Sequence, residues 1–246
     1  MNKLEIIAHR GYSAIAPENT KAAFLAAIEN GADSIEFDVQ FSWDGVLVVF
    51  HDFNLERTTN TQGKLREKTL VELKQIDAGI WFNPKFAGEQ ILTLAEALEI
   101  LKAIPQFLYF DLKSYSEWSQ KEVEKLVEIV INSEIKEKAV ITSFNESLNE
   151  RIREISGVVL NFGHLVSNKS SYESQLAKAV EKGDRLISSE YHILLENPAL
   201  IEETKSHGID VVAWTVDNPE EFQQLIDLGV TRIITNSLIG QLTINN

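Results

Sequence analysis

The chain of 246 residues has no cysteine, which excludes disulfide bonds and thiol chemistry. It is also poor in positive charge, because 23 basic residues against 37 acidic ones give a net charge of −14. So acidic a protein is not expected to bind nucleic acid or anionic membrane surfaces. A site for an anionic substrate would therefore need a local positive field, from a metal ion or from a few buried basic groups.

Long hydrophobic runs are missing as well. No segment of the sequence approaches the ~18 apolar residues that a membrane helix needs. The first residues, Met1-Asn2-Lys3, lead directly into an apolar strand pattern, which does not fit a signal peptide. We therefore expect a cytoplasmic protein without membrane insertion, and the sequence leaves its oligomeric state open.

The chain does contain a regular alternation of short β-rich apolar segments and longer amphipathic segments. Strands are expected at 4–9, 34–39, 107–112, 139–144, 157–163, 185–190, 210–216 and 232–236. Helices are expected near 19–30, 94–103, 117–132, 145–155, 171–182, 197–207 and 219–228. Eight strands with intervening helices predict an α/β fold, a TIM (β/α)8 barrel formed by one domain, 1–246. A doubly wound open sheet is the alternative, but its usual glycine-rich phosphate loop is not visible.

Residues 40–92 interrupt this alternation. They contain one short strand near 46–50, a polar turn-rich stretch and a short helical pattern at 70–76. Ordinary βα loops have roughly 2–6 residues, so this segment is too long to be one. We interpret it as a small insertion after strand 2 that covers the mouth of the barrel.

Carboxylates follow two of the expected strands. Glu36 and Asp38 are two residues apart, so both side chains point to one face, and Asp111 and Lys113 repeat this spacing. Inward carboxylates repel each other unless a cation lies between them, and hard divalent metals prefer oxygen ligands. Pairing of the first two with basic side chains, or a solvated position, is an equally good interpretation. For Asp111, a plain ion pair with Lys113 is the simpler interpretation.

Two histidines lie at strand ends. His9 closes the first strand, beside Arg10, and His51 follows the apolar stretch of the insertion. Histidines placed near an arginine and carboxylates suit a general acid and general base. The other three histidines have no such setting. Phe144 and Trp214 also end strands, where they would line a pocket or belong to the ordinary barrel core.

A series of short motifs runs along nearly the whole chain. In order, they are His9-Arg10-Gly11, Pro17-Glu18-Asn19-Thr20, Glu36-Phe37-Asp38-Val39, Asp44-Gly45, His51-Asp52, Leu55-Glu56-Arg57-Thr58-Thr59, Trp81-Phe82, Phe86-Ala87-Gly88-Glu89, Thr93-Leu94, Asp111-Leu112-Lys113, Ser143-Phe144 and Trp214-Thr215-Val216. Each motif is weak alone, but their order and spacing are specific. Together they resemble the glycerophosphodiester phosphodiesterase family.

The resemblance implies a TIM barrel that hydrolyses glycerophosphodiesters to an alcohol and glycerol 3-phosphate. It also implies one divalent metal ion, Mg2+ or Ca2+, with Glu36, Asp38 and Asp111 as ligands. The other site residues that it implies are His9 and His51 as the acid/base pair, Arg10 and Lys113 on the phosphate, and Phe144 and Trp214 beside the glycerol. For Arg10, pairing with Glu18 or another carboxylate to shape the first loop is the alternative. The partner that the resemblance implies is a small-molecule glycerophosphodiester.

Three positions depart from the family pattern. Asp111 stands where the family commonly has Glu, so it would reach the metal directly or through water. Leu92 replaces a proline, which changes only the stiffness of the loop. Asn236 replaces an aspartate, which removes one negative charge near the barrel mouth.

The residues and the resemblance agree on phosphodiester hydrolysis, with attack by the glycerol 2-hydroxyl and proton transfers shared by His9 and His51. The sequence does not identify the head group, whose pocket we expect in the insertion and in loops near 145–150 and 164–172. Three other interpretations stay open. They are a cyclising phospholipase-type enzyme, a non-catalytic binder of glycerophosphodiesters, and a metal-dependent sugar-phosphate isomerase.

Overall fold

Eight parallel strands close into a barrel in the computed structural model, which describes residues 3–157 and 160–238. The strands are β1 (Glu5–His9), β2 (Ser34–Phe41), β4 (Leu108–Leu112), β5 (Ala139–Thr142), β6 (Asn161–Val166), β7 (Leu186–Glu190), β8 (Asp210–Trp214) and β9 (Arg232–Thr235). Each pairs with its neighbours, and β1 pairs with both β2 and β9, so the ring is complete. The predicted (β/α)8 barrel is confirmed, and the open-sheet alternative is excluded.

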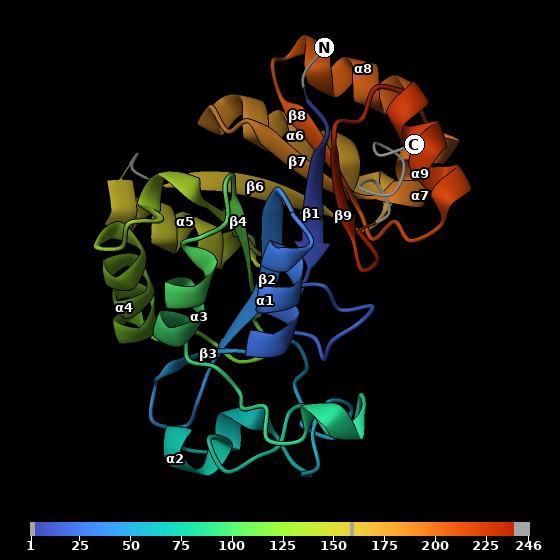
Figure 1. Cartoon of the computed structure of the whole chain (residues 1–246). Helices are drawn as coiled ribbons and strands as arrows, with labels where there is room; N and C mark the ends of the chain where they lie inside the picture. Colours follow the sequence, from blue (N-terminus) through green and yellow to red (C-terminus); the bar gives the residue numbers. More distant parts are fainter. Residues whose placement is uncertain (1–2, 158–159, 239–246) are drawn as a thin grey trace.

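Helices surround the strands (Figure 1). They are α1 (Lys21–Glu29), α3 (Leu94–Leu101), α4 (Gln120–Ile131), α5 (Glu146–Ser156), α6 (Lys169–Lys182), α7 (Tyr191–Glu196), α8 (Ala199–Ser206) and α9 (Pro219–Asp227). Many begin at a residue whose side chain accepts a hydrogen bond from the first turn, such as Thr93, Ser119 and Asn168. None of the helices in the described ranges is both long and apolar enough to cross a bilayer.

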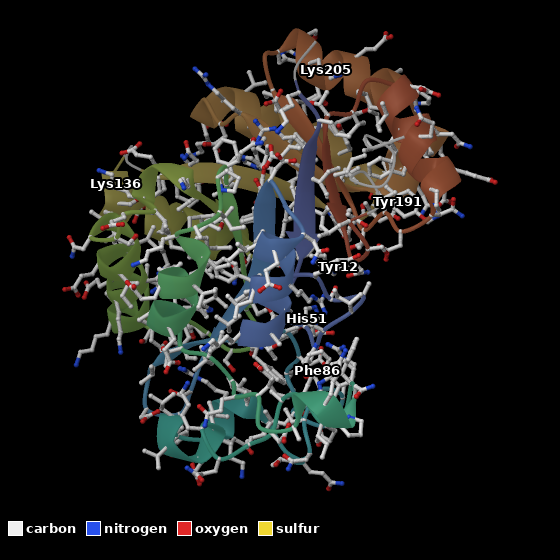
Figure 2. All side chains as sticks on the ribbon, in the orientation of Figure 1. Tyr12, His51, Phe86, Lys136, Tyr191 and Lys205 are labelled. Carbon is white, nitrogen blue, oxygen red and sulfur yellow. The ribbon has the colours of Figure 1, made fainter. Side chains whose placement is uncertain are left out.

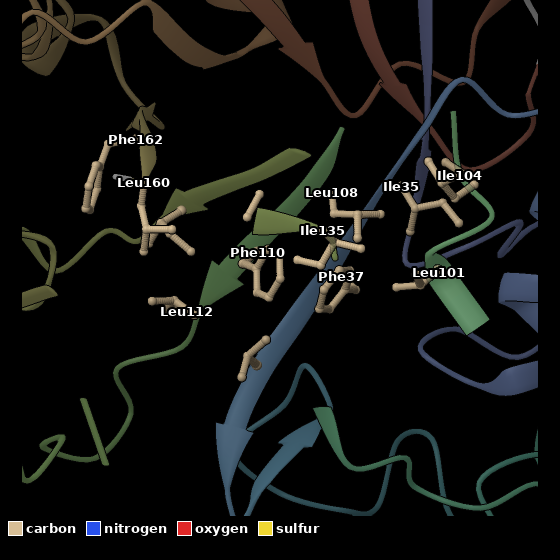
Figure 3. Close-up of a cluster of buried hydrophobic side chains, with 14 of the residues drawn as sticks. Ile35, Phe37, Leu101, Ile104, Leu108, Phe110, Leu112, Ile135, Leu160 and Phe162 are labelled. Atoms are coloured by element: carbon tan, nitrogen blue, oxygen red, sulfur yellow. The ribbon is translucent and has the colours of Figure 1, made fainter. Parts of the chain in front are cut away.

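Successive side chains of each strand point alternately into two hydrophobic cores, one inside the barrel and one outside it. Residues pointing into the barrel form a small inner cluster of Ile7, Tyr109, Val140, Leu186, Val212 and Ile234. Their neighbours along the strands point outwards and join a much larger cluster with the helices. Figure 3 shows Phe37 of β2 beside Phe110 of β4 in this outer layer, with ring centroids 4.6 Å apart. The parity places Glu36, Asp38 and Asp111 on the inner side, as predicted.

The segment between β2 and α3, residues 42–93, corresponds to the insertion that was predicted at 40–92. It contains β3 (Leu47–Val49), which pairs antiparallel with β2, the short helix α2 (Leu70–Leu73), and the 3-10 turns η1 (Leu65–Glu67) and η2 (Pro84–Phe86). It has its own small apolar cluster, which includes Phe50 and Leu55. In Figure 1 it lies beyond the arrowhead of β1, at the carboxyl ends of the strands.

Two elements differ from the prediction. Strand β6 runs from Asn161 to Val166, later than the expected 157–163, of which residues 158–159 lie outside the described residues. Helix α7 was not predicted, because its six residues are shorter than a detectable amphipathic period and follow β7 without a turn residue.

Candidate active site

The residues predicted for the site meet at the carboxyl end of the barrel. They surround a cavity of about 170 Å³, lined by His9, Arg10, Glu36, His51, Asp111, Lys113, Phe144 and Trp214 together with floor residues such as Tyr109 and Ser188. Asp38, the ninth predicted residue, is 1% exposed and contacts Arg10 and Lys113 of the lining. The carboxyl ends of strands are where barrel enzymes place their catalytic groups.

Three carboxylates form the centre of the site. Glu36, Asp38 and Asp111 each offer an oxygen, and these oxygens lie within 4.8 Å of one another. Burial raises the pKa of Glu36 well above its usual range, and the neighbouring Asp38 adds to this effect. Burial also raises the pKa of Asp111. Both shifts report negative charge that lacks full compensation.

Two basic side chains compensate part of this charge. Lys113 Nζ lies 2.9 Å from Asp38 Oδ1 and 2.5 Å from Asp111 Oδ2, while Arg10 Nε lies 3.2 Å from Asp38 Oδ2. Burial alone would raise the pKa of Asp38, but the charges of Lys113 and Arg10 hold it well below its usual range. The Asp111–Lys113 ion pair considered from the sequence is therefore present, and it lies inside the carboxylate cluster.

The donor set of the cluster fits a hard divalent cation. Two buried carboxylates and the partly buried carboxylate of Asp111 supply only oxygen ligands, which Mg2+ and Ca2+ both prefer. Asp111 Oδ1 is buried and has no hydrogen-bond partner among the residues that the structure describes. A buried carboxylate oxygen without a partner is costly, and a cation would satisfy it.

The two histidines are held by different partners. His9 Nδ1 lies 2.7 Å from Asn236 Oδ1, and its Nε2 lies 3.8 Å from Glu36 Oε2. His51 Nδ1 lies 2.5 Å from Asp52 Oδ1. In both cases the contact leaves Nε2 as the ring nitrogen available to a ligand. Figure 2 shows His51 where the barrel meets the insertion.

The loop between β1 and α1 bends sharply to bring Arg10 into the cavity. Arg10 has a φ of 56°, and its backbone N–H donates to the carbonyl of Glu36 at 2.8 Å. Gly11 follows with a φ of 82°, and a Cβ there would lie 2.7 Å from the backbone carbon of Ala23. Only glycine fits this approach of the loop to α1.

Several residues around the site had no catalytic or binding role in the sequence prediction. Asn19 holds Asp38 through a 2.7 Å hydrogen bond from its Nδ2. Asp52 and Glu18 contact His51 and Arg10, and Arg57 joins these two carboxylates. The motifs that contain these residues were visible, but only the fold shows that positions 39 residues apart, such as Glu18 and Arg57, touch.

Aromatic side chains line the outer part of the cavity. Phe144 is 54% exposed, and its ring lies edge-to-face to that of Trp214, with centroids 6.3 Å apart. Of the other histidines, His164 pairs with Asp184 at 2.8 Å and the exposed His192 with Glu190 at 2.6 Å. Neither histidine lines the cavity.

The closed barrel and the polar residues at its mouth define a (β/α)8-barrel enzyme. The chain belongs to the glycerophosphoryl diester phosphodiesterase family, whose sequence model matches residues 9–239. The resemblance inferred from the motifs is thus confirmed, and the protein is a phosphodiesterase.

Relatives with this activity in their names cover the chain almost completely. A glycerophosphodiester phosphodiesterase of Caldanaerobacter subterraneus is 38% identical, over 95% of this chain and 94% of its own length. A phosphodiesterase of Oleispira antarctica, solved with the product sn-glycerol-3-phosphate, has a TM-score of 0.91 and 27% identity, covering 98% of this chain and 97% of its own. A glycerophosphodiester phosphodiesterase from Agrobacterium tumefaciens has a TM-score of 0.82 and 27% identity, covering 96% of this chain and 98% of its own.

Proposed function

We propose that this protein hydrolyses glycerophosphodiesters to an alcohol and glycerol 3-phosphate with the help of one divalent cation. The observation that carries the proposal is the convergence of three carboxylates, two histidines and two basic side chains on one small cavity. The Oleispira relative, solved with glycerol 3-phosphate, supports the same product here.

Glu36, Asp38 and Asp111 would hold the cation, which is Mg2+ or Ca2+ by their chemistry. When bound, such an ion neutralises charge on a phosphate oxygen and lowers the pKa of a hydroxyl. Arg10 offers a planar fork of donors to the remaining phosphate oxygens, and Lys113 offers a compact positive charge. In a protein with a net charge of −14, these two side chains supply positive charge only where the anion binds.

His9 and His51 would share the proton transfers. One imidazole Nε2 takes the proton of the glycerol 2-hydroxyl as its oxygen bonds to phosphorus, and the other protonates the leaving alcohol oxygen. The resulting cyclic phosphate is opened by water, with the two histidines in reversed roles, which gives glycerol 3-phosphate. Each such transfer is typically worth roughly 10²–10⁴-fold in rate.

The alcohol half of the diester would lie over Phe144. The 170 Å³ cavity is smaller than the roughly 300–1,000 Å³ of usual ligand pockets, so a whole diester extends beyond it. A second cavity of about 430 Å³ shares Phe144 and Leu165 with it. The second cavity is lined by residues of the two regions expected to hold the head group, including Glu146, Asn149 and Asn168. The first region was expected to be a loop, but Glu146 and Asn149 lie in the first turn of α5, whereas Asn168 caps α6.

A coupled assay of glycerol 3-phosphate release tests the proposal. Choline, ethanolamine, glycerol and inositol esters should be compared, each with and without chelator. Release of the alcohol with glycerol 3-phosphate supports hydrolysis, whereas a cyclic phosphate as the final product supports the cyclising enzyme. Binding without turnover would support the non-catalytic binder. Conversion of a sugar phosphate without release of an alcohol would support the isomerase.

The histidine roles predict a specific pattern among variants. His9→Ala and His51→Ala should each lower kcat by at least about 100-fold while the melting temperature stays near that of the wild type. The double variant should lose much less than the product of the two losses, because the residues act as one unit. Turnover near that of the wild type in either single variant would contradict the assignment.

The cytoplasmic location stays a prediction, which cell fractionation tests.

A further inference from the structure

Arg57 of the insertion holds two carboxylates at once. Its Nε and Nη2 donate to Asp52 Oδ2 and Oδ1 at 2.6 and 3.0 Å. Its Nη1 and Nη2 donate to Glu18 Oε2 and Oε1, both at 2.7 Å. One guanidinium therefore fixes the orientation of both carboxylate planes, which a point charge could not do.

Each carboxylate in turn holds a different residue of the proposed active site. Asp52 Oδ1 contacts His51 Nδ1 at 2.5 Å. Glu18 Oε1 accepts a hydrogen bond from Arg10 Nη1 at 2.8 Å. An unbroken chain of contacts therefore runs from His51 through Asp52, Arg57 and Glu18 to Arg10, although Arg57 itself does not line the cavity.

A stabilising role alone does not account for this arrangement. The Arg57 side chain is 46% exposed, and exposed ion pairs typically contribute about 0–1 kcal/mol, with bidentate pairs such as these toward the upper end. Glu18 and Asp52 are more buried, at 12% and 23% exposure, and they lie between Arg57 and the site. What Arg57 supplies is two pairs of directed hydrogen bonds.

We infer that Arg57 is a positioning residue, through which the insertion sets the orientation of His51 and of Arg10 together. The inference rests on the proposed function, since it assigns proton transfer to His51 and phosphate binding to Arg10. It gives the insertion a part in turnover beyond covering the barrel mouth. Displacement of a catalytic group by about 1 Å can cost roughly 100-fold in rate, so a residue outside the cavity can matter this much.

The test compares Arg57→Ala with Arg66→Ala. Arg66 lies in the same insertion, also pairs with a carboxylate, Glu122 at 2.5 Å, and does not line the cavity. We expect Arg66→Ala to change kcat and KM less than about twofold. Arg57→Ala should lower kcat and raise KM, with kcat/KM falling about 10- to 100-fold, while both variants show similar melting temperatures.

Two further variants separate the contacts that lead from Arg57 to His51 from those that lead to Arg10. Asp52→Ala should lower mainly kcat, because it releases His51, and Glu18→Ala should raise mainly KM, because it releases Arg10. Adding Arg57→Ala to Asp52→Ala should cost little further kcat, and adding it to Glu18→Ala should cost little further KM. Full additivity in both pairs would overturn the inference.

Chemical rescue of activity distinguishes a positioning role of Arg57 from a purely structural role. Guanidinium ion, far below denaturing concentrations, should restore part of the kcat/KM of Arg57→Ala, and sodium chloride at equal ionic strength should not. If Arg57→Ala does not fold, Arg57→Lys carries the test, and it should lose most of the same activity because one ammonium cannot hold both carboxylate planes. Kinetics of Arg57→Lys near those of the wild type would then overturn the inference.

The outcomes also distinguish this inference from the proposed function. If the wild type releases no glycerol 3-phosphate, the proposed function fails. If the wild type is active and both Arg57→Ala and Arg66→Ala match it, only the positioning role fails. Equal losses in the two variants, together with equal losses of melting temperature, would show that ion pairs in the insertion serve stability alone.

Discussion

The two histidines of the site differ in the side chain that contacts Nδ1 of the ring. His51 contacts the carboxylate of Asp52, whereas His9 contacts the neutral amide of Asn236. The family commonly has an aspartate at position 236. Burial lowers the pKa of His9 to about 4, and the charge of Arg10 adds to this effect. A carboxylate stabilises imidazolium and an amide does so much less, so this substitution favours a neutral His9.

Asn236→Asp should therefore raise the pKa of His9. In a pH profile of kcat/KM, the limb that reports His9 should move to higher pH, while the limb that reports His51 stays in place. Movement of the acid limb would identify His9 as the base, since a base must be neutral to act. Movement of the alkaline limb would identify it as the acid. An unchanged profile would contradict a proton-transfer role for His9.

The carboxylate cluster predicts that a divalent cation stabilises the fold. Burial raises the pKa of Glu36 and Asp111, so their ionised forms cost stability as the pH rises above their usual range. A cation at 100 times its Kd adds about 2.7 kcal/mol, or roughly 5–10 °C in Tm for a chain of this size.

The shift should be large at pH 7 and smaller near pH 4, where protons compete with the cation for the oxygens of Glu36 and Asp111. Calorimetric melting curves with Mg2+, with Ca2+ and with chelator measure it. Asp111→Asn is the matched variant, and its shift should be reduced. Equal Tm values with chelator and with cation at pH 7 would rule out the metal site.

The shared orientation of the carboxylates was predictable because strand periodicity fixes which residues share a face. The two-residue spacing of Glu36 and Asp38 is therefore enough to predict that both side chains lie on one face of their strand. The partners of Arg57 were not predictable, because they depend on how the insertion folds back over the β1–α1 loop. Arg10 was expected to bind a phosphate, with pairing to Glu18 as the alternative. The structure shows it in the cavity lining with both Glu18 and Asp38 as partners, and its phosphate role stays a prediction.

At the scale of elements, the loop between β1 and α1 carries the tightest packing constraint of the site. Gly11 lies against Ala23 of α1, and the N–H of Tyr12 donates to the carbonyl of Ala23 at 3.0 Å. The loop is thereby fixed to the first turn of the helix. Arg10 and Asn19 at its two ends both have positive φ values, 56° and 58°.

Gly11→Ala should destabilise the protein and lower its activity. The added Cβ is strained by the left-handed backbone conformation and also overlaps Ala23. Together these effects should lower the free energy of unfolding by about 2–5 kcal/mol. Gly183→Ala is the control, because Gly183 has a similar φ of 72° but open space around it, so about 1–2 kcal/mol is expected with unchanged activity. Urea unfolding and kinetics measure both. Equal losses of unfolding free energy in the two variants would show that the overlap with Ala23 adds no destabilisation.

The order of elements was predictable where apolar runs were bounded by polar caps or glycine. Strand β2 and helix α4 fall within two or three residues of the prediction, because periodicity and a capping serine define them. Strand β6 was placed too early. Asn161 and Gly163 weaken its apolar pattern, and its pairing with β7 through residues 164–166 is a tertiary effect.

At the scale of the whole molecule, we propose that residues 1–246 form one domain. The apolar cluster of the insertion is small, and the insertion is tied to the barrel by β3 and by Arg57. An apolar cluster of that size does not sustain an independent fold.

Urea unfolding should therefore be a single transition by every probe. Far-UV circular dichroism follows the barrel helices. In a Trp118→Phe/Trp214→Phe variant, fluorescence follows only Trp43 and Trp81, which lie in the insertion. The two midpoints should coincide within error. An earlier fluorescence transition would show that the insertion unfolds by itself and would overturn the one-domain proposal.

The closure of the barrel also bears on how the protein behaves when it is concentrated. In the described parts of the chain, each barrel strand has a neighbour on both sides, and the outer side of β3 is met by Leu92 and Thr93. Exposed strand edges act as templates for aggregation between molecules. The native protein presents no such template over these residues, so the route to aggregates begins with opening of the ring.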